Sequence, residues 1–188
     1  MNSYTLIDLP AFDDRSSTFY SVIESARGSQ IKFKYVPRLA SFAVSYILPT
    51  GNVFPRDFGF IPSTLGRDGD PLDILVLLDV PTFTGCIIPT RVIGAIEAEQ
   101  TESGVSVRND RLIGIAAASH EYARIQSIDD LDPMILKEIE HFYTSYNEVR
   151  GRQFTPLERS GPEAARELIT KGMRAFAAKG AEGSQHNQ

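Results

Sequence analysis

The feature that most limits the fold is a series of short runs rich in β-branched and aromatic residues, separated by turn signals. Such runs favour strands, and their close spacing favours a barrel or sandwich over alternating βα units. They lie at 19–24, 31–35, 42–48, 53–61, 74–78, 86–98 and 111–117. In the run 31–35 apolar residues alternate with lysines, so we expect Lys32 and Lys34 on one face of a strand.

Two helices are expected later in the chain, packed against this β-rich body. Asp132 and Pro133 supply an N-cap and a first-turn proline, after which apolar residues repeat at helical spacing as far as Val149. A second helix is expected to begin near Gly161 and Pro162. A length of 188 residues fits one domain over 1–188, with an N-terminal extension at 1–16 and a disordered tail at 178–188.

Composition excludes several classes of protein. The net charge of −5, with no basic stripe, argues against a nucleic-acid-binding surface. No apolar run approaches the roughly 20 residues of a membrane helix, and residues 1–16 lack the plan of a secretory signal. The single cysteine, Cys86, cannot form an internal disulfide and fits a reducing compartment. We therefore expect a cytoplasmic protein without nucleic-acid or membrane partners.

Three aspartates crowd a turn just before a wholly apolar run. Asp68, Asp70 and Asp73 surround Gly69 and Pro71, and the run 74–78 follows. If the carboxylates converge, their repulsion needs relief by protonation or by a cation. Oxygen ligands favour hard divalent cations, and Mg²⁺ commonly shares its coordination with substrate phosphates.

The alternative is a plain surface turn, since Asp, Gly and Pro are ordinary turn residues. However, the apolar run is typical of a strand buried on both faces, which puts the acids at the mouth of a core strand. The sequence therefore predicts a phosphate-processing metal site ahead of a plain turn.

The segment 68–73, which reads D-G-D-P-L-D, resembles the signature of the family I soluble inorganic pyrophosphatases. The likeness extends to 22–24, 31–33, 54–61, 130–131 and the helix containing Tyr146, and it spans roughly 19–173. It implies a mainly β fold, an OB-like five-stranded barrel flanked by C-terminal helices. It also implies a Mg²⁺ cofactor, with Mn²⁺ as an alternative, a pyrophosphate substrate attacked by a metal-activated water, and a homo-oligomer.

The resemblance assigns roles to individual residues. Asp68 and Asp73 become metal ligands, and Asp70 becomes a metal-site carboxylate and the base for the attacking water. Lys32 would bind phosphate and Tyr146 would hydrogen-bond it, although a solvated strand lysine and a core tyrosine are the structural alternatives. These residues are joined by Glu24, as an outer acidic residue, and by Arg111, as a substrate-binding residue in place of the family's lysine.

Several positions depart from the family pattern. Tyr46 stands where an arginine is usual, Phe58 where a tyrosine is usual, and Asn147 where a lysine follows the helix tyrosine. Direct alignment puts Asn109 at a metal-bridging aspartate, which lowers the charge of the site. Asp110 replaces that carboxylate only if the strand slips by one residue, because in direct register it points to the opposite face.

Three functions follow from these residues. The first is Mg²⁺-dependent hydrolysis of pyrophosphate, slowed by the replaced residues. The second is hydrolysis of a substituted diphosphate by the same fold with a less polar rim. The third is a catalytically impaired protein that binds metal or phosphate.

Overall fold

The computed structural model describes residues 5–185, and of residues 182–185 only the backbone. Short 3₁₀ helices lie at Leu6–Asp8 (η1), Pro37–Leu39 (η2) and Ile128–Asp130 (η3), and the α-helices are α1 (Pro133–Glu148) and α2 (Pro162–Gln185). The strands are β1 (Phe12–Asp13), β2 (Thr18–Ser25), β3 (Ile31–Val36), β4 (Ser41–Ile47), β5 (Asp57–Phe60), β6 (Asp73–Leu77), β7 (Ile87–Glu102), β8 (Val105–Arg108), β9 (Arg111–Ala116) and β10 (Gln153–Ser160).

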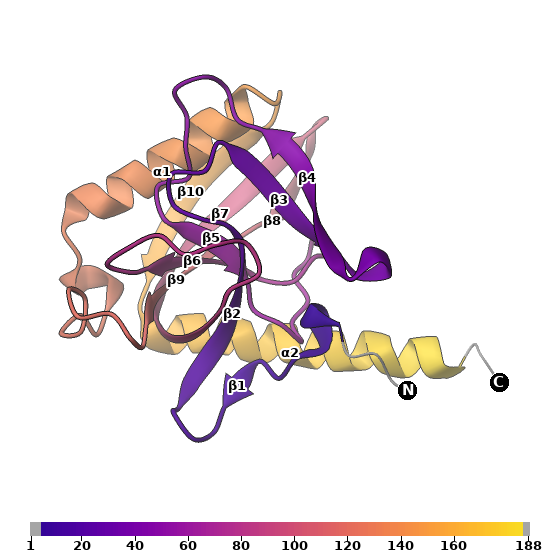
Figure 1. The fold of residues 1–188 in the computed structure, drawn as a ribbon. Coiled ribbons are helices and arrows are strands. Elements are labelled where there is room, and N and C mark those ends of the chain that lie inside the picture. Colours follow the sequence, from indigo (N-terminus) through magenta and orange to yellow (C-terminus); the bar gives the residue numbers. More distant parts are fainter. Residues whose placement is uncertain (1–4, 186–188) are drawn as a thin grey trace.

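A closed ring of strands forms the centre of the molecule. Its order is β2, β5, β6, β9 and β7, and β7 pairs back onto β2. Within the ring only β6 and β9 are parallel. The long strand β7 pairs with β2 at its start and with β8 and β10 near its end, so it joins the ring to the outer strands. With α1 and α2 on its outside (Figure 1), this architecture confirms the expected mainly β, OB-like fold.

Strand β6 is the core strand that carries the acidic turn at its start. Ile74 and Val76 belong to the apolar cluster that includes α2, whereas Leu75 and Leu77 belong to the cluster that includes α1. All four side chains are at most 1% exposed. Because side chains alternate along a strand, β6 is buried on both faces, as its apolar sequence predicts.

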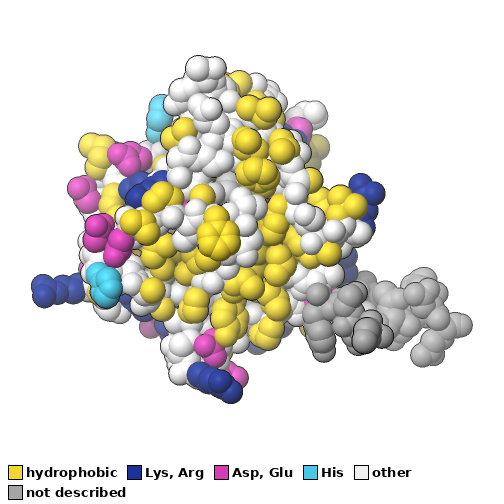
Figure 2. Space-filling model, in the orientation of Figure 1, with side chains coloured by type: hydrophobic (Ala, Val, Ile, Leu, Met, Phe, Trp, Pro, Cys, Tyr) yellow, Lys and Arg dark blue, Asp and Glu magenta, His cyan; other side chains and the backbone are white. Residues whose placement is uncertain are grey.

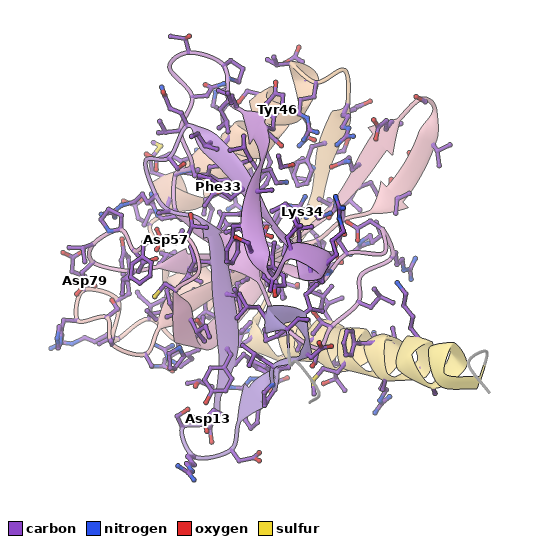
Figure 3. The ribbon with its side chains drawn as sticks, turned by 45° about the vertical axis from the view of Figure 1, so that its right-hand side comes forward. Asp13, Phe33, Lys34, Tyr46, Asp57 and Asp79 are labelled. Atoms are coloured by element: carbon purple, nitrogen blue, oxygen red, sulfur yellow. The ribbon has the colours of Figure 1, made fainter. Side chains whose placement is uncertain are left out.

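Strands β3 and β4 form a separate hairpin. Lys32 pairs with Tyr46 and Lys34 with Ala43, with a register shift between Lys32 and Phe33. Lys34 and Tyr46 both project from this hairpin (Figure 3). Both lysines line the same cavity.

The structure differs from the sequence expectations at several boundaries. Helix α1 ends at Glu148, and Val149 is 60% exposed, so its assignment to the buried stripe was wrong. Residues 53–56 precede β5 and are not part of it. Helix α2 continues to Gln185 through the segment expected as a tail, whose last residues, 186–188, lie outside the described part. Within the described residues, no helix is long and apolar enough to cross a membrane.

Candidate active site

A cavity of about 750 Å³ lies where four parts of the fold meet. The hairpin β3–β4 supplies lysines, and the turn before β6 supplies carboxylates. Asn109 and Arg111 come from the link after β8 and the start of β9, and the end of α1 with the turn after it supplies tyrosines and Arg150. Residues that are distant in sequence therefore line one cavity.

The turn that carries the aspartates is held by its own hydrogen bonds. The Gly66 amide donates to the Asp70 carbonyl at 2.7 Å, and the Asp70 amide donates to the Asp68 carboxylate at 3.1 Å. Gly69 has a φ of +88°, a conformation in which a side chain would be strained. Asp68, Asp70 and Asp73 all line the cavity as a result, which is the arrangement expected from their spacing.

Burial and crowding make the site costly for negative charge. Burial raises the pKa of Asp68, and the nearby carboxylates of Asp73 and Asp70 raise it further. Burial also raises the pKa of Glu24 to about 7, although the Tyr35 amide, 2.7 Å away, stabilises its charged form. Oxygen-only donors with excess negative charge fit a hard divalent cation.

These donors are not gathered around a single point. Among residues 5–185 as described, no three acidic, histidine or cysteine side chains are arranged as a ready metal site. Asp70 instead accepts from the Lys34 ammonium, at 2.7 Å and 2.8 Å to its two oxygens. Both side chains are about half exposed, so water screens this ion pair.

Asp73 also has a cation of its own, which is buried. The Arg111 guanidinium lies 2.8 Å from the Asp73 carboxylate and donates to the Asn109 side-chain oxygen. It also lies 4.8 Å from the centre of the Tyr143 ring and is only 5% exposed. Arg111 lines the cavity, but its charge is compensated by the ion pair with Asp73.

Asp110 is directed away from the cavity. Its carboxylate accepts from Arg108 at 2.7 Å and from the Ala98 amide at 3.0 Å, and it lines a neighbouring pocket. The Asn109 amide donates to the Ala98 carbonyl at 2.9 Å, and Asn109 lines the site cavity. The slip that would bring Asp110 into the place of Asn109 is therefore absent from this described segment.

The end of α1 closes the cavity with aromatic rings. The Lys32 ammonium lies 5.1 Å from the centre of the Phe58 ring and 5.8 Å from that of Tyr146. Tyr146 is buried, and its hydroxyl accepts from Arg150, a cavity residue that the sequence analysis did not single out. The sequence could have indicated this contact, because Tyr146 and Arg150 are four residues apart at the end of a helix.

Known proteins resemble the chain over most of its length. A family model described as inorganic pyrophosphatase matches residues 21–177. The inorganic pyrophosphatase of Geobacillus stearothermophilus is 38% identical over 147 residues, covering 78% of this chain and 87% of that protein. The Thermus thermophilus enzyme is 36% identical over 148 residues, covering 79% and 82%.

The solved structures agree with this assignment. The crystal structure of inorganic pyrophosphatase from Thermus thermophilus superposes with a TM-score of 0.85 and 32% identity, covering 93% of this chain and 99% of that one. A structure from Neisseria gonorrhoeae gives a TM-score of 0.81 at 26% identity, covering 90% and 96%. From sequence and structure together, the chain belongs to the inorganic pyrophosphatase family.

Proposed function

We propose that this chain hydrolyses inorganic pyrophosphate to two phosphates. The observation that carries the proposal is a cavity in which the carboxylates of the turn 68–73 face the same space as Lys32, Lys34 and Arg150. A highly charged diphosphate needs cations around its oxygens, and hydrolysis needs a base for the attacking water. The family matches support this function over hydrolysis of a substituted diphosphate.

Mg²⁺ is the cofactor that we propose, with Mn²⁺ as its substitute. Asp68 and Asp73 are the proposed ligands, with Asp70 beside them and Glu24 as an outer carboxylate. A bound divalent cation neutralises phosphate oxygens and makes a nearby water easier to deprotonate. The raised pKa of Asp68 supports this assignment, because part of its cause is the charge of the other two aspartates.

Asp70 is the proposed base. One of its carboxylate oxygens would accept the proton of the attacking water as that water's oxygen bonds to phosphorus. The bridging P–O bond breaks, and the proton can then pass to the departing phosphate. The exposed ion pair with Lys34 is weak enough to release the carboxylate, and the freed ammonium can contact phosphate.

Lys32, Tyr146 and Arg111 are the proposed substrate-binding residues. Lys32 is held near two rings of the cavity wall, which fixes its ammonium without neutralising it. Tyr146 presents its hydroxyl at the same wall. Arg111 would also hold Asp73 in place, since its guanidinium contacts that carboxylate.

The test is phosphate release by the purified protein from pyrophosphate and, in parallel, from ADP as a substituted diphosphate. We expect release from pyrophosphate with Mg²⁺, a weaker rate with Mn²⁺ and none after chelation with EDTA. Release from ADP but not from pyrophosphate would contradict the proposal and favour the substituted substrate.

We also propose that the chain is cytoplasmic and forms a homo-oligomer. Large exposed apolar side chains, including Val44, Ile47, Phe83 and Ile87, support an assembly that covers them. Figure 2 shows hydrophobic side chains across the centre of one face. Light scattering should give a mass that is a multiple of 20.8 kDa, and a monomer at micromolar concentration would rule the assembly out.

A further inference from the structure

The basic side chains of the cavity differ in whether a carboxylate neutralises them. Lys34 is paired with Asp70, Arg111 with Asp73, and Arg152 with Glu102 at 2.9 Å. Lys32 and Arg150 have no carboxylate partner in the described part of the chain, and both line the cavity. Their charge is therefore available to an anion.

Arg150 is held in place by two tyrosine rings. Its guanidinium lies 4.7 Å from the centre of the Tyr46 ring and 5.2 Å from that of Tyr146, and it donates to the Tyr146 hydroxyl. The two rings meet edge to face at 5.8 Å, so the guanidinium rests against a corner of aromatic surface. Such contacts fix an arginine and leave its charge intact.

The backbone also directs Arg150 to this position. Its amide donates to the Asn147 carbonyl at 2.9 Å, which continues the last turn of α1. Gly151, at a φ of +70°, then turns the chain away. A cation at the carboxyl end of a helix is stabilised by the helix dipole.

Lys32 and Arg150 share the ring of Tyr146, since the ammonium and the guanidinium both lie within 6 Å of its centre. Two like charges held near one ring repel each other unless an anion binds between or beside them. The remaining guanidinium donors of Arg150, Nε and Nη2, make no hydrogen bond to the described residues. A phosphate group carries two or more negative charges and several acceptor oxygens, so it can bind both cations. A guanidinium can donate two parallel hydrogen bonds to it.

We propose that Arg150 binds one phosphate group of the substrate and is a specificity-determining residue of this site, with Tyr46 as its positioning residue. The proposal rests on the proposed function, because it takes the substrate to be a diphosphate. One phosphate would lie beside Arg150 and Lys32, and the other would lie toward the aspartates of the turn 68–73.

The test is the affinity for methylenediphosphonate, which cannot be hydrolysed at its bridge, measured by calorimetry with Mg²⁺ present. Arg150→Met removes the charge and retains the length of the side chain. We expect a loss of roughly 10- to 100-fold in affinity and a similar rise in KM for pyrophosphate, with a smaller fall in kcat. Arg150→Lys retains the charge but cannot donate two parallel hydrogen bonds to one phosphate. Its affinity should lie between those of wild type and Arg150→Met.

Arg152→Met is the matched control, because it removes the same charge two residues away, where Glu102 already neutralises it. It should alter the affinity less than threefold. Melting temperatures show whether each variant is folded. Arg150→Lys, which preserves the cation, still tests the role of Arg150 if Arg150→Met does not fold. An unchanged affinity in Arg150→Met, or an equal loss in Arg152→Met, would overturn the inference.

The outcomes separate this inference from the proposed function. Hydrolysis by the wild type with an Arg150→Met affinity equal to wild type would refute the role of Arg150 alone. Binding of methylenediphosphonate that depends on Arg150, in a wild type that releases no phosphate, would support the role of Arg150 and refute the hydrolysis.

Discussion

Charge compensation at single residues distinguishes this site from a bare cluster of carboxylates. Asp70 has Lys34 and Asp73 has Arg111, whereas Asp68 and Glu24 have no cation in hydrogen-bond contact within the described residues. Burial is the main cause that raises the pKa of each of those last two carboxyls. Negative charge on Asp68 and Glu24 is therefore the least compensated in the site, and both carboxyls hold a proton more readily than usual.

Glu24 should make the metal-free protein less stable as pH rises. Its folded pKa of about 7 lies above its ordinary value of 4.5, so the folded state holds the proton more tightly than the unfolded state does. The free energy of unfolding should fall between these two pH values and level off above the folded pKa. In Glu24→Gln this fall should vanish, giving the variant an advantage of up to about 3 kcal/mol near pH 8.

Urea unfolding in EDTA across this pH range measures the difference. The glutamine can still accept from the Tyr35 amide, so the comparison isolates the charge. If the free energy of unfolding changes with pH in the same way in wild type and in Glu24→Gln, then Glu24 ionises normally in the folded state.

Asn109 should limit how well the site holds its cation. Asn109→Asp adds a carboxylate to the cavity while preserving an acceptor for Arg111. The Mg²⁺ concentration for half-maximal hydrolysis should fall by about tenfold, equivalent to about 1.4 kcal/mol. Mg²⁺ titration of activity and of melting temperature measures this, with Asn52→Asp, outside the cavity, as the control. An unchanged Mg²⁺ requirement would place Asn109 outside the metal's reach.

The sequence predicts the acidic turn well but not its partners. The spacing of Asp68, Asp70 and Asp73 and the apolar run after them suffice to place these acids at the mouth of a core strand. Lys34 is 36 residues from Asp70, and only the packing of the hairpin against the turn brings them together. Arg150 is a similar case, because its guanidinium lies over Tyr46, where the family resemblance implies an arginine.

At the scale of elements, the site depends on close contact between strands. Strands β2 and β5 pair with Ile23 opposite Gly59, and a Cβ on Gly59 would lie 2.0 Å from the Val22 carbonyl oxygen. That distance is far inside van der Waals contact with backbone, which cannot swing aside. Glycine is therefore required there by packing.

Gly59→Ala should destabilise the fold by more than about 3 kcal/mol, because strands β2 and β5 would have to separate. Chemical denaturation measures the loss. Gly161→Ala is the matched control, since a Cβ there meets nothing within 4 Å. A Gly59→Ala midpoint close to that of the control would mean that the strands are not as close as described.

Elements with apolar patterns were predictable from sequence, and polar edge elements were not. Strands β2 to β7 and β9 match expected runs, apart from their ends. Strand β10 has mostly exposed or half-buried residues and contains Pro156, and it is a strand because it pairs along β7. Strand β8 is likewise exposed or half-buried and is fixed by its pairing with β7. Tertiary pairing, which no local pattern reports, decides both.

At the scale of the whole molecule, the closed ring provides one wall of the cavity and the hairpin β3–β4 provides another. The carboxylates stand on the ring, at the start of β6, whereas Lys32 and Lys34 stand on the hairpin. These two lysines and the carboxylates thus reach the cavity from separate structural units, whereas Arg111 reaches it from ring strand β9. Substrate binding between them would join the two units.

The rate of phosphate release from Mg²⁺-pyrophosphate by wild type, Asp70→Asn and Asp14→Asn tests this arrangement most directly. Asp14 is exposed and lies outside the cavity, so its variant controls for the loss of one carboxylate. We predict that Asp14→Asn retains the wild-type rate and that Asp70→Asn loses at least about 100-fold, the lower range for removing a general base. A full rate in Asp70→Asn would contradict the assignment of the base and of the site built around it.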